Sequence, residues 1–228
     1  MTTWRVADAT SDAFKWKYNG LWVLPQSTQL DLRWFAEEGG CRPHVVEAAL
    51  RHTEGRRMAI DVGAHVGSWT IPLSRAFEMT HAFEPILQNW AALVVNMGRG
   101  RSEHATCWLA AVGERAGNCL PTYKVNASMS SDVNPKRRGI IPVMTLDMLT
   151  GPVDLVKIDA EGSEPAVLLG AQELLRAWSP TLVLEWKPKR LNEWQPDGEA
   201  VAQAVLDRLG YEVVEELEVD RILKRRKA

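Results

Sequence analysis

The sequence lacks the features of a membrane-spanning, secreted or polyanion-binding protein. Its 228 residues contain no apolar run approaching about 18 residues, and the first ten residues do not resemble a signal peptide. Three cysteines, Cys41, Cys107 and Cys119, form no Cys-x-x-Cys pair, which is typical of a reducing compartment rather than of a disulfide framework. A formal net charge of −2 gives no general attraction to nucleic acid or to anionic membranes. We therefore expect a soluble cytoplasmic protein without a membrane partner, and nucleic acid is not expected as a partner. No feature of the sequence sets an oligomeric state.

The aromatic residues are unevenly distributed, with ten tryptophans but only three tyrosines and four phenylalanines. Four of the tryptophans fall within the first 34 residues. Indole rings supply a large contact area with few rotatable bonds, so packing roles are favoured over a substrate lid. A hydrophobic content of 46% is enough for one substantial core.

Strand and helix patterns alternate from residue 58 onward. We expect strands near 58–62, 79–83, 106–112, 153–158 and 181–186, and helices near 67–77, 86–97, 164–177 and 199–209. This alternation predicts an α/β fold with a doubly wound, mostly parallel sheet. Two further strand patterns, 210–215 and 217–223, are joined by a tight turn.

The N-terminal quarter shows a different pattern. Residues 14–18 and 21–24 flank an Asn-Gly pair, which predicts a β-hairpin, and residues 31–37 and 43–53 read as helical. We therefore predict that residues 1–55 form a hairpin and helical cap packed on the same domain as residues 56–228.

A glycine-containing motif follows the first strand of the alternating region. Residues 58–70 read Met-Ala-Ile-Asp-Val-Gly-Ala-His-Val-Gly-Ser-Trp-Thr. Gly63 permits a sharp turn, and Gly67 lets the next helix start close to the strand and to a ligand above it. The spacing is not that of dinucleotide enzymes, and there is no Lys-Ser or Lys-Thr pair of a phosphate-binding loop, so neither NAD nor ATP is expected. The motif predicts a nucleoside-binding loop; a plain tight turn is the alternative.

A second acid, Glu84, ends the next strand pattern and precedes Pro85. In a βαβ unit, a carboxylate at this position accepts hydrogen bonds from ribose hydroxyls; a solvent-exposed acid is the alternative. Because the carboxyl ends of parallel strands meet at one edge, we expect five strand-end residues around a single crevice, namely Asp61, Glu84, Ala111, Asp159 and Glu185.

Four ordered motifs, 61–67, 83–85, 145–147 and 153–164, resemble those of the FkbM family of S-adenosylmethionine-dependent methyltransferases. The resemblance implies a Rossmann-like class I methyltransferase fold with one antiparallel strand near the C-terminus, and S-adenosylmethionine as cofactor. Family members usually carry Asn at the position of His65. The cofactor-binding residues implied are Asp61, Gly63, Ala64, His65, Gly67, Ser68, Glu84, Pro85, Ala111 and Asp159.

Transfer of a methyl group to a hydroxyl requires alignment of the reacting atoms and a base for the hydroxyl proton. Asp159 and Glu185 are the predicted catalytic residues, with Asp159 preferred. Glu161, Lys157 and Ser130 are candidate substrate contacts. Lys157 could instead form a structural ion pair, and Glu164 could cap the helix that it begins. A Mg²⁺ ion is possible but not predicted; its ligands would be Asp159, Glu161 and Glu185.

Residues that are absent disfavour other methyl acceptors. Asp-Ala-Glu-Gly at 159–162 is not the Pro-Pro-aromatic motif of amine methylation, no Pro-Cys pair supplies a nucleophile for cytosine carbon, and Glu185 stands where ribose methyltransferases of the Lys-Asp-Lys-Glu type place lysine. We therefore predict methylation of a hydroxyl on a small polar molecule, a sugar or a secondary metabolite. Two alternatives are an RNA-directed methyltransferase that uses the basic loop 134–139 and the basic tail, and a non-enzymatic nucleotide-fold interaction module whose loop is spoiled by His65.

Overall fold

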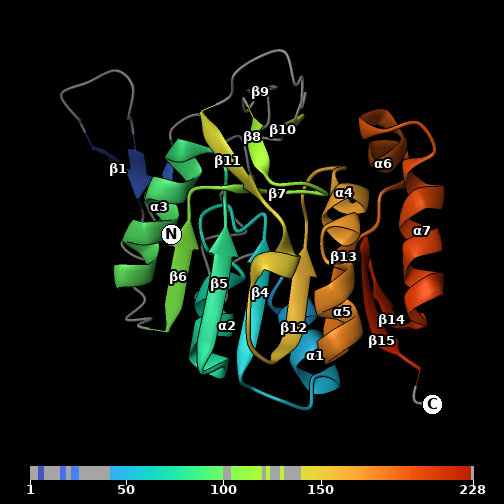
Figure 1. Cartoon of the computed structure of the whole chain (residues 1–228). Coiled ribbons are helices and arrows are strands. Elements are labelled where there is room, and N and C mark those ends of the chain that lie inside the picture. The colour runs from blue at the N-terminus through green and yellow to red at the C-terminus, as the bar shows by residue number, and fades with distance from the viewer. Residues whose placement is uncertain are drawn as a thin grey trace.

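The computed structural model describes residues 5–7, 16–18, 22–25, 42–99, 104–119, 122–123, 129–130 and 140–226. A seven-stranded sheet in the order β14-β15-β13-β12-β4-β5-β6 forms its centre (Figure 1). Strands β13 to β6 are mutually parallel, and β15 runs antiparallel to both of its neighbours, which confirms the predicted fold class. The strands are β4 (Met58–Val62), β5 (Met79–Phe83), β6 (Ala105–Trp108), β12 (Val153–Ile158), β13 (Thr181–Glu185), β14 (Tyr211–Leu217) and β15 (Asp220–Arg225).

Helices cover both faces of this sheet because alternate strand residues are apolar on each side. Ile60 and Val156 pack against α4 (Glu164–Leu169), α5 (Gln172–Trp178) and α7 (Gly198–Leu209). On the other face, Ala59 and Leu155 pack against α1 (Pro43–His52) and α2 (Thr70–Ala76). Ala82, on the same face, packs against α3 (Leu87–Arg99).

Several boundaries differ from the prediction, and three of these differences change how an element is divided or where it begins. Helix α2 begins at Thr70 rather than at 67, because Gly67 has a φ of +101°, which no helical residue adopts. The predicted helix 164–177 is two helices that break at Gly170, where a Cβ would lie 2.1 Å from the Gly113 carbonyl oxygen. Close packing against the Gly113 carbonyl therefore excludes a side chain at this break.

The predicted strand 106–112 is also divided. β6 ends at Trp108, and the following β7 (Ala111–Val112) leaves the main sheet to pair with β11 (Ile141–Met144), which also pairs with β8 (Gly117–Cys119). The prediction that Ala111 lies at the end of a strand of the central sheet is therefore wrong. Elements that the sequence patterns did not predict include α6 (Pro188–Trp194) and the 3-10 helix η2 (Leu146–Met148).

The N-terminal hairpin is confirmed by antiparallel pairing of β2 (Trp16–Tyr18) with β3 (Val23–Pro25), and β1 (Arg5–Ala7) adds a third strand. The Asn96 side chain on α3 fixes β3: its Oδ1 accepts from Val23 N at 2.7 Å, and its Nδ2 donates to Val23 O and to Val66 O at 2.9 Å. The predicted turn at 19–20 and helix at 31–37 lie outside the described residues. The division at residue 55 stays a prediction. None of the described helices has both the length and the apolar content to cross a membrane.

Candidate active site

The glycine loop after β4 and the acid after β5 lie against each other. Gly63 N and Ala64 N both donate to Phe83 O at 3.0 Å. His65 N donates to Glu84 Oε2 at 2.9 Å. The two segments predicted to form a nucleoside site therefore converge at the carboxyl edge of the sheet.

Backbone groups fix the Glu84 carboxylate. Besides the bond from His65, Oε1 accepts from Ile86 N at 2.9 Å and from Asn89 Nδ2 at 3.4 Å. Burial raises the pKa of Glu84 to about 7, against the opposing effect of these donors. A carboxylate has about four acceptor positions, so these three donors leave one. Contact with both ribose hydroxyls would require the long Asn89 bond to open.

The two glycines are required by close packing around the loop. Gly63 has a φ of +76°, and a Cβ there would lie 1.8 Å from the carbonyl oxygen of Asp159, the residue that follows β12. A Cβ on Gly67 would lie 2.9 Å from Leu93 Cδ1 on α3. His65 takes the same left-handed backbone region, at a φ of 52°, and burial lowers the pKa of its imidazole to about 4. His65 is therefore neutral near pH 7, and its presence leaves the loop's bond to Glu84 intact.

A buried ion pair supports the loop from below. Asp61 and Lys157 are cross-strand neighbours on β4 and β12, with Lys157 Nζ 3.1 Å from Asp61 Oδ1. Lys157 Nζ also donates to Gly63 O at 2.9 Å, and Thr70 Oγ1 donates to Asp61 Oδ2 at 2.6 Å. Asp61, which the sequence predicted to bind the cofactor, is fully buried, and the contacts that it makes in this structure are with the protein. Burial tends to lower the pKa of Lys157, but Asp61 and Asp159 outweigh it and raise the pKa, which keeps the amine charged.

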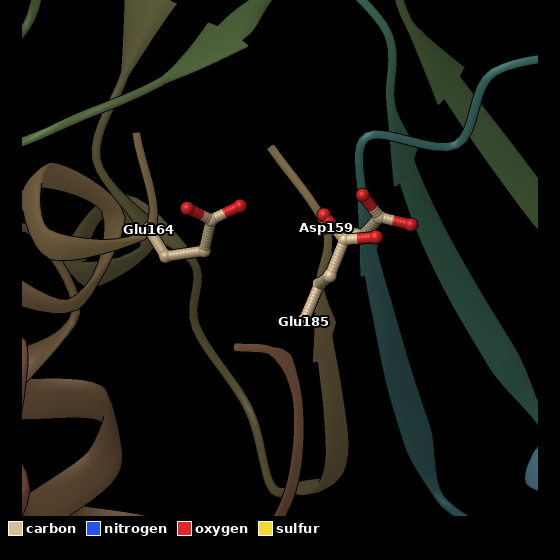
Figure 2. A group of neighbouring side chains, drawn as sticks. All are labelled: Asp159, Glu164 and Glu185. Atoms are coloured by element: carbon tan, nitrogen blue, oxygen red, sulfur yellow. The ribbon is translucent and has the colours of Figure 1, made fainter. Parts of the chain in front are cut away.

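A group of carboxylates lies beside the loop, at the ends of β12 and β13 (Figure 2). Asp159, Glu164 and Glu185 each offer one oxygen within 4.8 Å of the others. The Asp159 side chain is 24% exposed, whereas Glu185 is 5% exposed. Burial and the neighbouring Asp159 raise the pKa of Glu185 to about 7. The structure thus brings together both predicted catalytic acids and adds Glu164, which the sequence assigned to a helix start.

Three cations adjoin these acids, and the sequence patterns did not indicate two of them. Lys187 Nζ lies 2.6 Å from Glu185 Oε1. Arg42, at the start of α1, donates a hydrogen bond from Nη1 to Asp220 Oδ2. Its Nη2 lies 3.9 Å from both Asp159 Oδ2 and Glu185 Oε1. Lys157 Nζ lies 3.9 Å from Asp159 Oδ2. Arg42 is far from the acids in sequence, so only the packing of α1 on the sheet reveals it.

The remaining predicted residues occupy varied positions. Glu161 has a φ of 54°, and its Oε2 lies 3.4 Å from Arg190 Nη1 rather than in the carboxylate group. Ser68 and Pro85 are half-buried beside the loop. Ser130 belongs to β10 (Met129–Ser130), which pairs with β9 (Thr122–Tyr123) outside the main sheet. At the end of β6, Trp108 rather than Ala111 borders Glu84: Glu84 N donates to Trp108 O at 3.1 Å, and the Trp108 ring stacks on Phe83.

Comparisons with known proteins identify the family and the fold. The family model described as the methyltransferase FkbM domain matches residues 61–213. The structure is similar to methyltransferase FkbM from Methylobacillus flagellatus KT, with a TM-score of 0.54 and 18% identity over 74% of this chain and 43% of that one. It is also similar to precorrin-6y C5,15-methyltransferase from Geobacter metallireducens GS-15, with a TM-score of 0.50 and 16% identity over 83% and 91% of the two chains. No curated protein sequence matches the chain. At these identities the structural likenesses show the fold, and the chain spans less than half the length of the first of these structures.

Proposed function

Because this chain belongs to the methyltransferase FkbM domain family, we propose that it transfers a methyl group from S-adenosylmethionine to a hydroxyl of a small polar molecule, a sugar or a secondary metabolite. Asp159 carries the proposal: its carboxylate is partly exposed at the end of β12, and its carbonyl oxygen packs directly beneath Gly63 of the loop. A base is thereby held next to the place expected for the cofactor.

The cofactor half of the proposed site is the loop and Glu84. The left-handed turns of residues 63–68 present a backbone surface for the methionine and ribose portions, whereas the N–H groups of Gly63, Ala64 and His65 already donate within the protein. Glu84 accepts from the ribose. Ala64, His65, Gly67, Ser68 and Pro85 border this surface, whereas Asp61 acts from below by holding Lys157. Ala111, on β7, remains a proposed contact.

The acceptor half is the group of acids at the ends of β12 and β13. The acceptor oxygen forms a bond to the methyl carbon as the bond from carbon to sulfur breaks, which releases S-adenosylhomocysteine. Asp159 takes the hydroxyl proton, and Glu185, whose pKa is near 7, is placed to share it. The protein's own contribution is thus alignment and proton removal. Glu161 and Lys157 remain proposed contacts of the acceptor. For Ser130, a contact with the acceptor stays a prediction from the sequence.

Calorimetry with S-adenosylhomocysteine tests the cofactor half. We expect binding to the wild-type protein, and Glu84→Ala should weaken it by about 1–3 kcal/mol because ribose hydrogen bonds are lost. A folded wild-type protein that takes up no S-adenosylhomocysteine would refute the proposal.

The chemistry is tested with methyl-labelled S-adenosylmethionine and three acceptors, methyl α-glucoside, myo-inositol and catechol. Methyl ethers survive mild base whereas methyl esters do not, so base treatment of the product identifies the acceptor atom. Asp159→Asn should reduce turnover at least tenfold without changing S-adenosylhomocysteine affinity, and Glu173→Gln, an exposed acid on α5, is the matched control. If affinity collapses as well, Asp159 is a cofactor ligand rather than a base.

An RNA-directed activity is tested in the same assay with transfer RNA at two salt concentrations. Binding through phosphates would fall steeply as salt rises. The loop 134–139, on which that alternative depends, lies outside the described residues. We also propose a cytoplasmic location from the cysteine pattern; Cys107 and Cys119 are free thiols.

A further inference from the structure

Glu164 has a buried oxygen that the fold leaves unsatisfied. The residue is 1% exposed, and its Oε1 accepts from Ala160 N at 2.8 Å and from Gly162 N at 3.2 Å. Its Oε2 has no hydrogen-bond partner among the described residues. A buried acceptor without a donor destabilises the fold, and more so when it is charged. Capping the turn therefore explains one oxygen of Glu164 and not the other.

The carboxylate of Glu164 points toward Asp159 and Glu185 (Figure 2). The three side chains come from the end of β12, the start of α4 and the end of β13. One oxygen of each lies within 4.8 Å of the other two. This spacing is somewhat wider than the coordination sphere of a small cation, so binding would require the side chains to rotate toward one another.

The surrounding cations do not balance this group. Among the described residues, three of the four neighbouring cations have their nearest carboxylate outside this group, and the fourth is paired with Glu185. The pairs are Lys157 with Asp61, Arg42 with Asp220, Lys187 with Glu185 and Arg190 with Glu161. Asp159 has only the two contacts at 3.9 Å, and no ion pair to Glu164 is found in the described part of the chain. Two carboxylates therefore remain without a close cation of their own.

We propose that Asp159, Glu164 and Glu185 bind a divalent cation of the Mg²⁺ or Mn²⁺ kind. Hard cations prefer carboxylate oxygens, and a divalent ion matches the two uncompensated charges and satisfies Glu164 Oε2. Lys187 contacts Oε1 of Glu185, which leaves Oε2 of that residue as the ligand atom.

The ligand set bears on the acceptor, and this step rests on the proposed function. Three protein ligands leave about three positions of an octahedral ion for water or acceptor oxygens. An acceptor with two adjacent oxygens, such as a vicinal diol, could occupy two of these positions, and the ion would favour the ionised form of the hydroxyl that Asp159 faces.

Binding of Mn²⁺ to the chelator-treated full chain, without cofactor, tests the site. The electron paramagnetic resonance signal of free Mn²⁺ should fall until about one ion per chain is bound, and Mg²⁺ should reverse this. Glu164→Gln and Glu185→Gln should each weaken binding at least tenfold. The exposed Glu173→Gln should stay within twofold of wild type.

Circular dichroism establishes that each variant is folded, and the two ligand variants provide independent tests. Absence of Mn²⁺ binding to folded wild-type protein overturns the proposal and leaves the acids to share protons instead. Equal affinity of Glu164→Gln and wild type also overturns it. Because S-adenosylhomocysteine binding is measured separately, failure of the metal site is distinguishable from failure of the methyltransferase proposal.

Discussion

Replacement of Lys157 by methionine isolates the charge that supports the proposed cofactor loop, since methionine nearly matches the length of lysine. Lys157 Nζ lies 3.1 Å from the fully buried Asp61 carboxylate and donates to the Gly63 carbonyl at 2.9 Å. Without the ammonium group, Asp61 keeps only Thr70 as a donor among the described residues. Breaking a buried ion pair by removing one partner costs about 3–5 kcal/mol. We expect Lys157→Met to lower the free energy of unfolding by about 4 kcal/mol.

Urea unfolding of Lys157→Met, Asp61→Asn and the double variant measures the pair itself. The double variant should lose at least about 1 kcal/mol less than the sum of the single losses, because neither remaining group is then a lone buried charge. Lys189→Met, on the exposed surface of α6, is the control and should change the free energy of unfolding by less than about 0.5 kcal/mol. Additive losses would refute the assignment of a supporting ion pair.

The same variant separates loop support from general stability. Since Asp61 and Asp159 raise the pKa of Lys157 above its ordinary value, the pair's contribution is present below that ordinary value and is lost only at higher pH. The loss in Lys157→Met should therefore be constant from pH 6 to pH 9. Affinity for S-adenosylhomocysteine should also fall, because Gly63 O loses its donor.

Three further results follow from individual residues. Because burial raises the pKa of Glu84 to about 7, the ionised fraction of Glu84 falls about tenfold between pH 8 and pH 6. The affinity for S-adenosylhomocysteine, measured by calorimetry, should fall with this fraction. The same pH profile in a Glu84→Gln variant would contradict this explanation. Gly63→Ala should cost more than about 3 kcal/mol in urea unfolding, from left-handed strain and collision with Asp159 O; a loss below about 1 kcal/mol would show that the loop yields easily. Gly98→Ala on α3 meets no atom within 4 Å and should stabilise the protein by about 0.5–1 kcal/mol; a lower melting temperature would count against the helix as described.

Sequence patterns located the central strands because these strands are buried on both faces. β4, β5 and β12 match their predicted bounds, as short apolar runs between turn signals leave little choice of position. The end of β6 could not be found in this way, since Ala111 and Val112 continue the apolar run. Their departure toward β11 depends on a partner about 30 residues later, which local pattern does not encode.

In the candidate site too, local sequence patterns predicted some residues, and contacts between distant segments determine the others. Asp159 and Glu185 follow buried strands, so their meeting at one edge could be inferred from parallel topology. The local sequence led us to interpret Glu164 as a capping residue. That interpretation accounts for the hydrogen bonds of Oε1 alone. Arg42 carries no local signal, and its role depends on how α1 docks against β15 and β13.

The two halves of the site are stabilised by different means, and this has a chemical consequence. Glu84 is held mainly by the backbone N–H groups of His65 in the loop and of Ile86 just before α3, which remain in place when side chains change. Glu185 is paired with the Lys187 side chain, and Asp159 has only contacts at 3.9 Å with Arg42 and Lys157, so this half depends on side chains that can rotate. Under the proposed function, a preorganised cofactor half combined with a rearrangeable acceptor half would let changes in the residues around the acids accommodate different hydroxyl compounds. Substitutions near Arg42 and Lys187 should therefore alter acceptor choice before they alter cofactor affinity.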